Sequence, residues 1–509
     1  MAPPRTRHAD AVVIGSGLGG TLAALRLSEA GTRTILLERG RWPRRDRTDW
    51  NPDAILSDLR YRGPQPLKVR QGGARRFRDL AQNETVGGMS VFYGAASLRL
   101  RPGDFAHWPI SYEDLEPWYD EAERVLGVHG TDGADPLEPP RLAPYPYRSV
   151  PYAAPAERIR DAGERLGLRP FPIPLAIDFA GANGAPCVLC NTCDGFPCAI
   201  EAKNDAAGLL RRAGSRRRLD VLTGVRVRRL RFAGDRVVAA DATSGSRGEE
   251  LSFAAPLFVL AAGAIGSPAL LLRSGLAEGE RNPLPVGRFL MRHCNAVVAG
   301  LFRSPTNPEQ VFHKQVCFTD FYEDQRAETG RATGVIQDIY TPDAGVVRRA
   351  AGRVVGALLR RPVVDRLQNL LCVAEDEPDP GNRVTLGLGP GAGGRGPVRV
   401  EHRYRRADWQ RLARLTRQAV RILREAGALG THVWRITSFS HAVGTLRMGS
   451  AGEDAVLHAD GRVRGLRNLF VTDGSAFPAS GGVNPSLTIA ANALRIADGI
   501  VAADRGAVW

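Results

Sequence analysis

The sequence predicts an α/β fold with more than one domain, and two observations support this. Residues 11–14 and 34–38 are short apolar runs typical of buried strands, and the segment between them has the apolar spacing of a helix. The chain has 509 residues, whereas a single hydrophobic core rarely grows beyond about 250–300 residues. We therefore expect a parallel, helix-covered sheet at the N-terminal end and a second, α+β region elsewhere in the chain.

The first predicted strand runs directly into a glycine-rich turn. Gly15, Gly17 and Gly20 have the spacing Gly-x-Gly-x-x-Gly, the predicted helix follows, and the second strand ends on Glu38. Such glycines let the backbone approach a pyrophosphate, the helix N-terminus favours that anion, and the carboxylate accepts hydrogen bonds from a ribose. The pattern predicts a Rossmann-type dinucleotide site, for FAD or NAD rather than NADP because the acid suits an unphosphorylated ribose.

A second predicted helix begins near the C-terminus, in SGGVNPSLTIAANALRIADG (480–499). Pro485 suits the first turn of a helix, and Asn484 is a preferred residue directly before it. The apolar run 487–503 predicts a helix that is buried on most sides, so its positive N-terminal end points inward. Asn484 is then either a plain helix cap or a side chain that faces a ligand.

The net charge of +15 would suit a nucleic-acid-binding protein, but the kind and distribution of the basic residues do not support that function. Almost all of this charge is arginine, since the only lysines are Lys68, Lys203 and Lys314. The basic runs 211–218 and 360–362 carry no interleaved aromatic residues, so we expect no nucleic-acid partner. We see no apolar stretch of the roughly 20 residues that span a bilayer, and the polar start leaves no room for a secretory signal. We expect no membrane span and a cytoplasmic location.

Five separated blocks resemble, in order and in spacing, the glucose–methanol–choline (GMC) family of FAD-dependent oxidoreductases. They are the N-terminal motif, NETVGGMSVFYG with its continuation (83–123), FVLAAGAIGSPALLLRSG (258–275), EDEPDPGNRVTL (375–386) and the segment 440–501. The resemblance implies that an alcohol is oxidised to an aldehyde or ketone by FAD. It also implies a discontinuous FAD-binding domain, residues 1–100, 200–295 and 440–509, and a substrate-binding cap domain, residues 101–199 and 296–439.

The same resemblance implies further FAD contacts. They come from the second block, from the strand DVLTGVRVRRL and from the C-terminal segment, at Gly87, Gly88, Ser90, Val227, Asp473, Gly474, Asn484, Pro485 and Thr488. Some relatives hold the flavin covalently through a histidine in the second block, and the matching position here is Phe92. We therefore expect the FAD to be bound non-covalently.

The resemblance also implies a catalytic pair, His441 in SHAVGT and Asn484 in GGVNPS. A neutral imidazole takes the hydroxyl proton as general base, and the helix that starts near Pro485 turns its positive end toward the charge that builds up on the reduced flavin ring. Asn484 holds the alcohol oxygen by hydrogen bonding and so fixes which C–H bond points at the ring. The other eight histidines are expected to be structural or on the surface: 8, 107, 129, 293, 313, 402, 432 and 458.

Four of the seven cysteines, Cys187, Cys190, Cys193 and Cys198, lie in CVLCNTCDGFPCAIEAKND. This spacing is compatible with structural thiols or disulfides, with an iron–sulfur cluster and with zinc, and it departs from the bacterial ferredoxin pattern. The sequence leaves these alternatives open. A cluster would make the chain a flavin electron-transfer subunit that passes electrons to a partner protein.

The substrate is the least defined part of the prediction. The second block and Asn484 resemble the bacterial branches that oxidise sugars and sterols, and the arginine- and alanine-rich composition fits enzymes that convert a sugar primary alcohol to an aldehyde in aminoglycoside biosynthesis. The acceptor is oxygen or another oxidant. A cationic substrate would need nearby carboxylates, and Glu375, Asp376 and Glu377 are candidates, with a solvated loop as the alternative. The basic amphipathic segment 343–371 is expected to be a lid helix or, alternatively, a membrane-surface helix.

Overall fold

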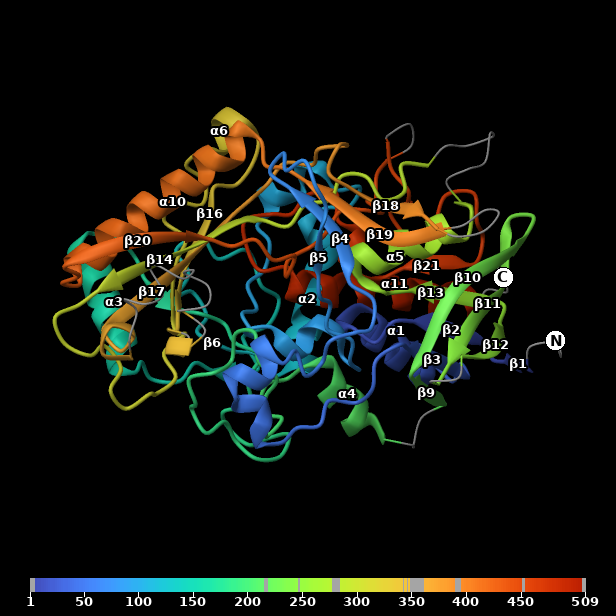
Figure 1. Cartoon of the computed structure of the whole chain (residues 1–509), viewed down its shortest axis with the longest axis horizontal. Coiled ribbons are helices and arrows are strands. Elements are labelled where there is room, and N and C mark those ends of the chain that lie inside the picture. Colours follow the sequence, from blue (N-terminus) through green and yellow to red (C-terminus); the bar gives the residue numbers. More distant parts are fainter. Residues whose placement is uncertain are drawn as a thin grey trace.

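The computed structural model describes residues 5–505 except 215–217, 246–247, 277–283, 342, 346, 348–360, 390–394 and 451–453. These residues form two parts that lie at opposite ends of the long axis, one built on a five-stranded sheet and the other on a six-stranded sheet (Figure 1). Two smaller four-stranded sheets and a two-stranded ribbon complete the strands. The α/β fold predicted from the sequence is confirmed.

The five-stranded sheet is parallel throughout. Its strand order is β21 (Leu469–Val471), β13 (Leu257–Leu260), β2 (Ala11–Ile14), β3 (Thr34–Glu38) and β9 (Leu219–Thr223). Every residue of β21, β13, β2 and β3 is buried, which explains why these strands are apolar without alternation. Both N-terminal strands lie where the sequence predicts them.

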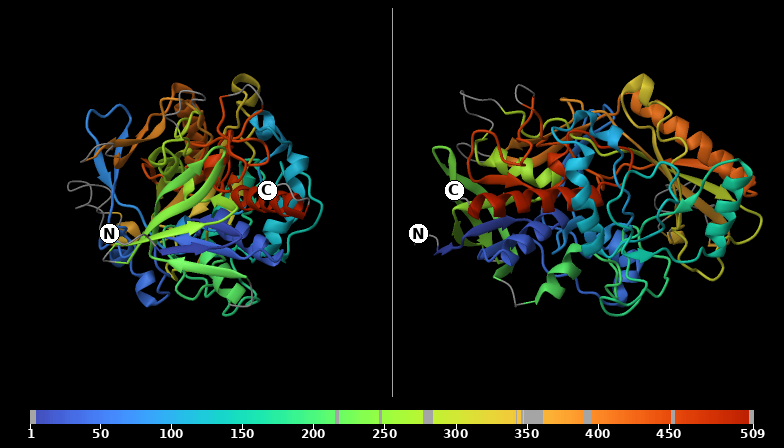
Figure 2. Two further views of the ribbon diagram at one scale, coloured as in Figure 1. Left: turned by 90° about the vertical axis from the view of Figure 1, so that its right-hand side faces the viewer. Right: turned by 180° about the vertical axis from the view of Figure 1, so that it is seen from behind.

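One helix packs against this sheet, and two further helices follow it in succession. α1 (Leu18–Glu29) contacts β2, β3 and β13, α11 (Ser486–Arg505) lies along α1, and α2 (Tyr112–Leu126) contacts α11 (Figure 2, right). α11 is the predicted C-terminal helix. It is long and apolar enough to span a bilayer by length and composition, which corrects the expectation that no such segment exists. Its window Ser486–Ala503 is 56% buried, as in the core helix of a globular domain.

A four-stranded sheet extends this part. It is formed by β1 (Arg5–His8), β12 (Glu249–Ala254), β11 (Arg236–Ser244) and β10 (Val225–Ala233). The predicted strand DVLTGVRVRRL is therefore two strands, β9 and β10, which belong to different sheets and meet at Gly224. α4 (Ala206–Ala213) contacts α1, and α5 (Gly263–Arg273) contacts β10.

The six-stranded sheet is antiparallel. Its order is β20 (Gly430–Arg435), β14 (Cys294–Leu301), β17 (Leu367–Ala374), β16 (Gly334–Ile339), β15 (Val316–Phe318) and β8 (Phe171–Pro172). α10 (Arg406–Glu425) covers its outer face, and α3 (Ala154–Arg165) contacts α10 (Figure 1). The other face of the sheet is turned toward the five-stranded part.

The remaining strands form one four-stranded sheet and one two-stranded ribbon. β18 (Arg383–Leu388), β19 (Arg395–His402), β4 (Leu67–Gln71) and β5 (Arg78–Leu80) form the sheet, whose strands β18 and β19 contact α5, and β6 (His129–Gly130) pairs with β7 (Tyr147–Arg148). Strands from the predicted FAD segments thus pair with strands from the predicted cap segments. The proposed domain boundaries stay a prediction.

The predicted lid or membrane-surface helix 343–371 is only partly described. Residues 346 and 348–360 lie outside the described residues, so about half of that segment has no structural account. Its end does not continue as a helix: α9 (Arg361–Val364) is one short turn, and Leu367 already begins β17. The interpretation as a helix is wrong for residues 367–371, whose apolar side chains belong to a buried strand. A further short helix, α6 (Arg326–Thr329), precedes β16.

Candidate functional site

The glycine-rich turn lies between β2 and α1, and its glycines serve two different purposes. A Cβ on Gly20 would lie 1.9 Å from the carbonyl oxygen of Gly15, so this glycine lets the helix approach the turn. A Cβ on Gly17 would meet no atom within 4 Å, so the space in front of it is open. α1 begins directly after Gly17 without a side-chain cap and without an acidic residue in its first turn. The turn therefore offers unpaired N–H groups to an anion in that open space.

Glu38 lies at the end of β3, where the sequence places it, and is buried. Its Oε2 accepts hydrogen bonds from the backbone N–H of Ser16 at 3.1 Å and from the Ser16 hydroxyl at 2.6 Å, and its Oε1 accepts from Gly40 N at 2.7 Å. A carboxylate has about four lone-pair sites. Glu38 thus fixes the glycine-rich turn and keeps acceptor capacity for a ribose hydroxyl.

Ser16 also ties the second block to the first. Its hydroxyl accepts a 3.0 Å hydrogen bond from the backbone N–H of Gly87. A Cβ on Gly88 would lie 3.4 Å from the Cα of Gly17, so the two glycine-rich segments lie against each other. Ser90 is buried and bonds within the protein, donating to Gly87 O at 2.7 Å and accepting from Ala206 N at 3.0 Å.

The predicted C-terminal contacts lie at the start of α5 and α11. Asp473 accepts hydrogen bonds from Gly263 N, Ser267 and Ser475, so its carboxylate joins the start of α5 to the 3₁₀ turn Gly474–Ala476. Burial raises the pKa of Asp473. The Thr488 hydroxyl bonds the Tyr119 hydroxyl at 2.8 Å. Both side chains hold protein elements in place, which leaves their backbone groups for a ligand.

Val227 and Pro485 complete the predicted set. Val227 lies on β10, partly buried, and a register shift of the β10–β11 pairing follows it. Pro485 precedes α11, and its carbonyl accepts a 2.9 Å hydrogen bond from Ile489 N in the first turn. Val227 thus lies next to an irregularity in the β10–β11 strand pairing, and Pro485 lies where the helical hydrogen bonds of α11 begin.

The loop 480–484 before α11 is buried throughout. A Cβ on Gly481, where φ is +67°, would lie 2.2 Å from Cδ2 of Leu100, and a Cβ on Gly482 would lie 2.6 Å from the Tyr322 ring. The glycine pair thus lets the loop fit between these side chains. The Gly482 N–H donates to the Tyr322 hydroxyl at 3.0 Å, which fixes the loop directly before Asn484.

His441 lies beside a second histidine that the sequence did not single out. His293 is 1% exposed, and its Nδ1 lies 3.0 Å from Nδ1 of His441. Its Nε2 lies 2.9 Å from Gly481 O and 3.2 Å from Ser480 O. Carbonyl oxygens only accept, so Nε2 of His293 carries the proton. These bonds are compatible with the expected structural role of His293, and its contact with His441 adds a positioning role that the sequence did not indicate.

The hydrogen bonds set the tautomer of His441. Burial lowers the pKa of His293, so that ring is neutral near pH 7 and its Nδ1 accepts. His441 must then donate from Nδ1, which leaves its Nε2 unprotonated. Burial, followed by the neighbouring His293 and the Lys314 ammonium, lowers the pKa of His441 to about 3. The free basic nitrogen is thus present across the physiological pH range.

Asn484 is 8% exposed, and its amide also has a fixed partner. Nε2 of Gln337, on β16, donates to Oδ1 of Asn484 at 2.6 Å. The carbonyl of Asn484 is therefore occupied, and its NH₂ remains as a donor. The site thus joins a basic nitrogen to a hydrogen-bond donor, which is what removing a hydroxyl proton while holding the oxygen requires.

The segments of His441 and Asn484 are held together by the backbone. Gly444 N donates to Gly474 O at 3.0 Å, and Leu446 N donates to Ser475 O at 2.8 Å. His293 completes the connection, because it contacts both His441 and the carbonyl of Gly481. The structure therefore brings the two predicted catalytic segments to one place.

The three candidate carboxylates for a cationic substrate are already paired. Glu375 and Asp376 are buried, so the alternative of a solvated loop is wrong for them. Glu375 bonds Arg331 at 2.9 Å, and Asp376 accepts from the backbone N–H groups of Arg292 and His293 at 2.9 and 3.0 Å. Glu377 lies 3.2 Å from Arg411 and 3.4 Å from Arg405. These acids support the protein rather than offer free negative charge.

The cysteine segment is fixed by lysines. Nζ of Lys203, which is 2% exposed, donates to the carbonyls of Tyr93, Cys193 and Phe196 at 2.7, 3.1 and 2.7 Å. Lys314 pairs with Asp194 at 2.6 Å. All seven cysteines are described and none forms a disulfide. The described residues hold no group of three or more side chains that could ligate a metal.

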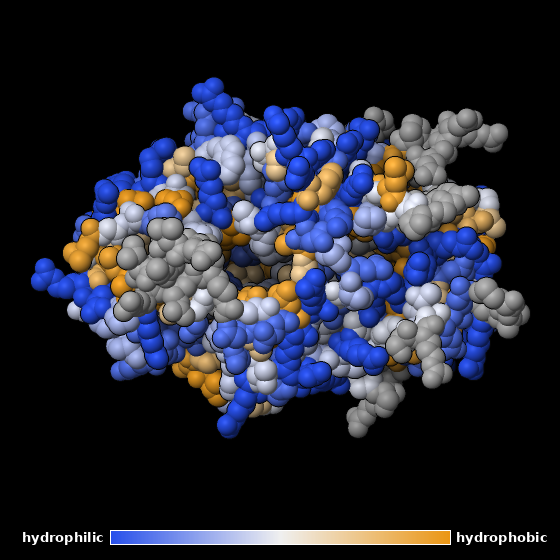
Figure 3. Space-filling view, in the orientation of Figure 1, coloured by the Kyte–Doolittle hydropathy of each residue, from blue (hydrophilic) through white to orange (hydrophobic). Residues whose placement is uncertain are grey.

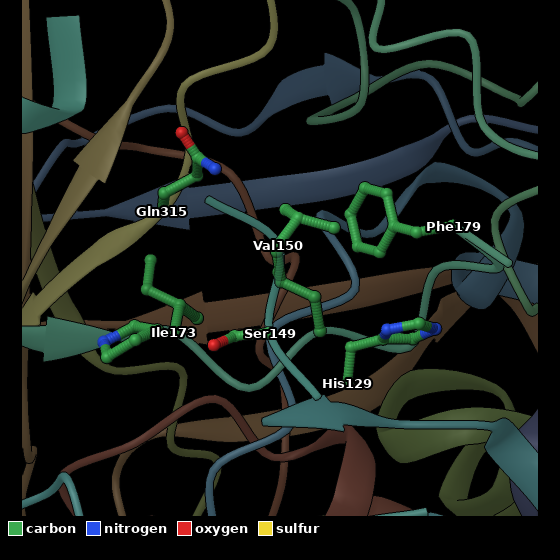
Figure 4. Close-up of a pocket in the computed structure, with 8 residues that line it drawn as sticks. His129, Ser149, Val150, Ile173, Phe179 and Gln315 are labelled. Carbon is green, nitrogen blue, oxygen red and sulfur yellow. The ribbon is translucent and has the colours of Figure 1, made fainter. Parts of the chain in front are cut away.

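A small pocket lies away from this site, between the β6–β7 ribbon and the β8 edge of the six-stranded sheet (Figure 4). In this view His129 and Phe179 lie on the right of the pocket, Ile173 lies on the left, and Ser149 and Val150 lie between them. His129 donates from Nδ1 to Arg148 O at 2.8 Å. None of the predicted site residues lines this pocket. A separate hollow opens between the two parts of the molecule in the view of Figure 3.

Family models for the GMC oxidoreductases match residues 9–295 with their N-terminal part and residues 378–493 with their C-terminal part. The chain belongs to the GMC oxidoreductases. It is 32% identical to the 6'''-hydroxyparomomycin C oxidase of Streptomyces lividus, over 98% of this chain and 93% of that protein. It is also 32% identical to the paromamine 6'-oxidase of Streptomyces fradiae, over 96% of this chain and 91% of that protein.

The fold agrees with this membership. The formate oxidase of Aspergillus oryzae RIB40 superposes with a TM-score of 0.72 at 13% identity, over all of both chains. GMC oxidoreductases are FAD flavoproteins, and this chain is an FAD-dependent enzyme that oxidises alcohols.

The residues present fit an FAD molecule. The open space at Gly17 and the uncapped start of α1 suit the pyrophosphate, and Glu38 at the end of β3 suits the adenosine ribose. Gly88 lies against Gly17, so the second block borders the same space. The side chains of Ser90, Asp473 and Thr488 are engaged within the protein, so any contact they make to FAD uses their backbone or their remaining lone pairs.

Proposed function

We propose that this GMC oxidoreductase oxidises a hydroxyl group of a sugar or amino sugar, with His441 as the general base and Asn484 as the hydrogen-bond donor to the alcohol oxygen. The observation that carries the proposal is the His293–His441 hydrogen bond. Because it fixes the proton of His441 on Nδ1, it supplies a neutral base with a free Nε2.

The oxidation removes a proton from the hydroxyl and a hydride from the carbinol carbon. Nε2 of His441 takes the hydroxyl proton, and the C–O bond becomes a double bond as the hydride leaves. When bound, FAD supplies the acceptor for that hydride. A base with a pKa of about 3 is weak, so we infer that the proton moves together with the hydride rather than before it.

Asn484 provides the second contact. Its NH₂ donates to the alcohol oxygen, because its carbonyl is held by Gln337. This donor fixes the direction of the carbinol C–H bond. When FAD is bound, the positive end of the helix dipole of α11, which begins two residues later, would stabilise negative charge on the flavin.

Two features favour a sugar or amino sugar as substrate. The relatives at 32% identity are named for oxidation of paromamine and of a hydroxyparomomycin, both over nearly the whole chain. The six-stranded sheet also carries buried carboxamides, which bind hydroxyl groups by hydrogen bonds. Sterols and other alcohols remain the alternative substrate class that the test includes.

The test is an anaerobic visible spectrum of the purified flavoprotein before and after addition of paromamine, methyl α-D-glucopyranoside, cholesterol and 1-propanol. We expect the flavin band to bleach with paromamine or the glucoside. The His441→Asn variant should bleach about 10²–10⁴-fold more slowly, whereas His432→Asn, which changes an exposed histidine of β20, should match the natural chain. Unchanged bleaching in His441→Asn would remove His441 as the base.

Re-admission of air shows whether oxygen is the electron acceptor. Recovery of the flavin band on the timescale of turnover assigns oxygen as acceptor, and its absence assigns another oxidant. We propose that the FAD is non-covalent, because the matching position is Phe92, and trichloroacetic acid precipitation should then release the flavin into the supernatant.

A further inference from the structure

We propose that Gln337 sets both the direction of the Asn484 amide and the substrate class of the site, by donating to Asn484 and accepting a hydrogen from a second donor group of the substrate. That group is a hydroxyl or an ammonium near the reacting carbinol. The inference rests on the proposed role of Asn484 in alcohol oxidation and extends it to substrate selection.

Gln337 lies on the face of the six-stranded sheet that is turned toward the flavin-binding part. Its neighbours on β16, Ile336 and Asp338, point to the opposite face because side chains alternate along a strand. Ile336 belongs to the apolar cluster formed with α10, whereas Val335 belongs to the cluster of the five-stranded part. Gln337 shares the side of Val335 and is fully buried there.

The donor half of Gln337 is used within the protein. Its Nε2 lies 2.6 Å from Oδ1 of Asn484. The reverse arrangement would place the Asn484 carbonyl toward the alcohol, where it would accept a hydrogen bond from the hydroxyl and turn the O–H away from His441. The amide direction thus keeps a donor beside the oxygen and leaves proton removal to His441.

The acceptor half of Gln337 has no partner. Oε1 is buried and makes no hydrogen bond to any described residue. Leaving a buried acceptor unpaired costs free energy, so such a group marks a place that a ligand donor fills. Because the same side chain contacts Asn484, that donor belongs to the molecule whose alcohol oxygen Asn484 holds.

A second unpaired acceptor lies on the same face of the sheet. Oδ1 of Asn295, on β14, is buried without a partner among the described residues. β17 separates β14 from β16, and Asn295 and Gln337 both pair with β17, through Val373 and Leu371. Because Val373 and Leu371 are two residues apart on β17, the Cα atoms of Asn295 and Gln337 are about 12 Å apart, roughly 10 Å across the strands and 7 Å along them. A polyhydroxylated or aminated ring system offers donors at such a spacing, and a simple aliphatic alcohol does not.

Two variants separate the two halves of Gln337. Gln337→Met removes both the donor and the acceptor at nearly the same length. Gln337→Glu keeps acceptors but replaces the donor with a carboxylate oxygen, which turns the Asn484 amide over. Gln368→Met is the matched control, because Gln368 is 1% exposed on the neighbouring strand β17 but bonds Arg158 and Pro155 on the other face.

The measurement is steady-state oxidation of paromamine, methyl α-D-glucopyranoside and 1-propanol, with oxygen or an artificial dye as the electron acceptor, giving KM and kcat for each. Gln337→Glu should lower kcat by about 5- to 150-fold for every alcohol and keep the preference for the polyols. Gln337→Met should lower kcat for every alcohol and also raise KM about 5- to 150-fold for the polyols alone. Gln368→Met should change neither kcat nor KM for any of the alcohols. Equal effects of Gln337→Met and Gln368→Met, or an unchanged polyol preference in Gln337→Met, would overturn the proposal.

A binding measurement makes the test independent of turnover. Calorimetric titration of methyl 6-deoxy-α-D-glucopyranoside, which lacks the primary hydroxyl, should show weaker binding to Gln337→Met than to Gln368→Met by about 5-fold or more. If no alcohol bleaches the flavin of the natural chain, the proposed function fails. The titration then still decides whether Oε1 of Gln337 binds a sugar hydroxyl, and equal binding by both variants refutes it.

Discussion

Replacing His293 by leucine tests how His441 becomes a base. Leucine removes the acceptor that lies 3.0 Å from Nδ1 of His441, and it leaves the carbonyls of Ser480 and Gly481 without their His293 donor. A buried donor without an acceptor costs about 1–3 kcal/mol. His441 avoids that cost by moving its proton to Nε2, and the free base is then present in only a fraction of molecules. A penalty of that size corresponds to a decrease of about 5- to 150-fold in the rate of flavin reduction.

The assay is anaerobic stopped-flow reduction of the bound flavin at a saturating concentration of the alcohol that bleaches it. His293→Gln provides the rescue, because its carbonyl accepts from His441 and its NH₂ donates to Gly481. We expect His293→Gln to reduce the flavin within about 5-fold of the natural rate. His129→Leu is the control for loss of a buried histidine outside the site, since His129 is 5% exposed and lines the separate pocket.

Equal rates for His293→Leu and the natural chain would refute the tautomer argument. Equal impairment of His293→Leu and His293→Gln would refute it as well, because packing rather than hydrogen bonding would then explain the loss. FAD content and melting temperature are measured for all three variants, so that loss of cofactor is not counted as loss of base.

Four further predictions concern the pH dependence of the rate, folding stability, FAD binding and the cysteine segment. The rate of flavin reduction should be independent of pH from about 5 to 8, because the pKa of His441 is lowered to about 3; a tenfold fall per pH unit below 6.5 would contradict this. The pKa of His441 is about 6.5 in the unfolded chain and about 3 in the folded chain, so between these values the unfolded chain binds one more proton at His441 and folding stability falls as the pH decreases. Between pH 7 and 5, His441→Asn should therefore lose less stability than the natural chain, as measured by urea titration at each pH. Gly17→Ala should lower FAD content with little change in the melting temperature of the apoprotein, whereas Gly20→Ala, whose Cβ would lie 1.9 Å from Gly15 O, should lower both. Lys203→Met should lower the free energy of unfolding by about 3 kcal/mol or more and speed alkylation of Cys193, since three carbonyls lose their donor.

The cofactor half of the site was predictable because its residues are close in sequence. Gly15, Gly17, Gly20 and Glu38 lie within one β–α–β unit, and the turn, the helix start and the acid each have a recognisable local pattern. The same holds for the start of α11, where Pro485 and the apolar run predict a buried helix. Local chemistry decided these features, so the sequence alone was enough.

The partners of the catalytic pair were not predictable in the same way. His293 is 148 residues from His441 along the chain, and Gln337 is 147 residues from Asn484. Neither belongs to a motif, and nothing near them in the sequence distinguishes them from a buried core histidine and a strand glutamine. Their roles come from strand pairing and from which face of the sheet they occupy. The weak signal that existed was the polar character of Gln337 inside an otherwise apolar strand, GVIQDI.

The predictable residues belong to the five-stranded part, which holds the cofactor, and the unpredictable ones belong to the six-stranded part. The five-stranded part supplies the open turn at Gly17 and the carboxylate of Glu38, and these suit any FAD-dependent reaction. His293, at the start of β14, and Gln337, on β16, come from the six-stranded part, and they fix which atom of His441 accepts and which atom of Asn484 donates. Substitutions on the inner face of β14, β16 and β17 can therefore change which alcohol is oxidised without changing how FAD is held. The motifs for this reason identify the cofactor and the reaction, whereas we propose that the substrate is selected by side chains of the sheet that carry no motif.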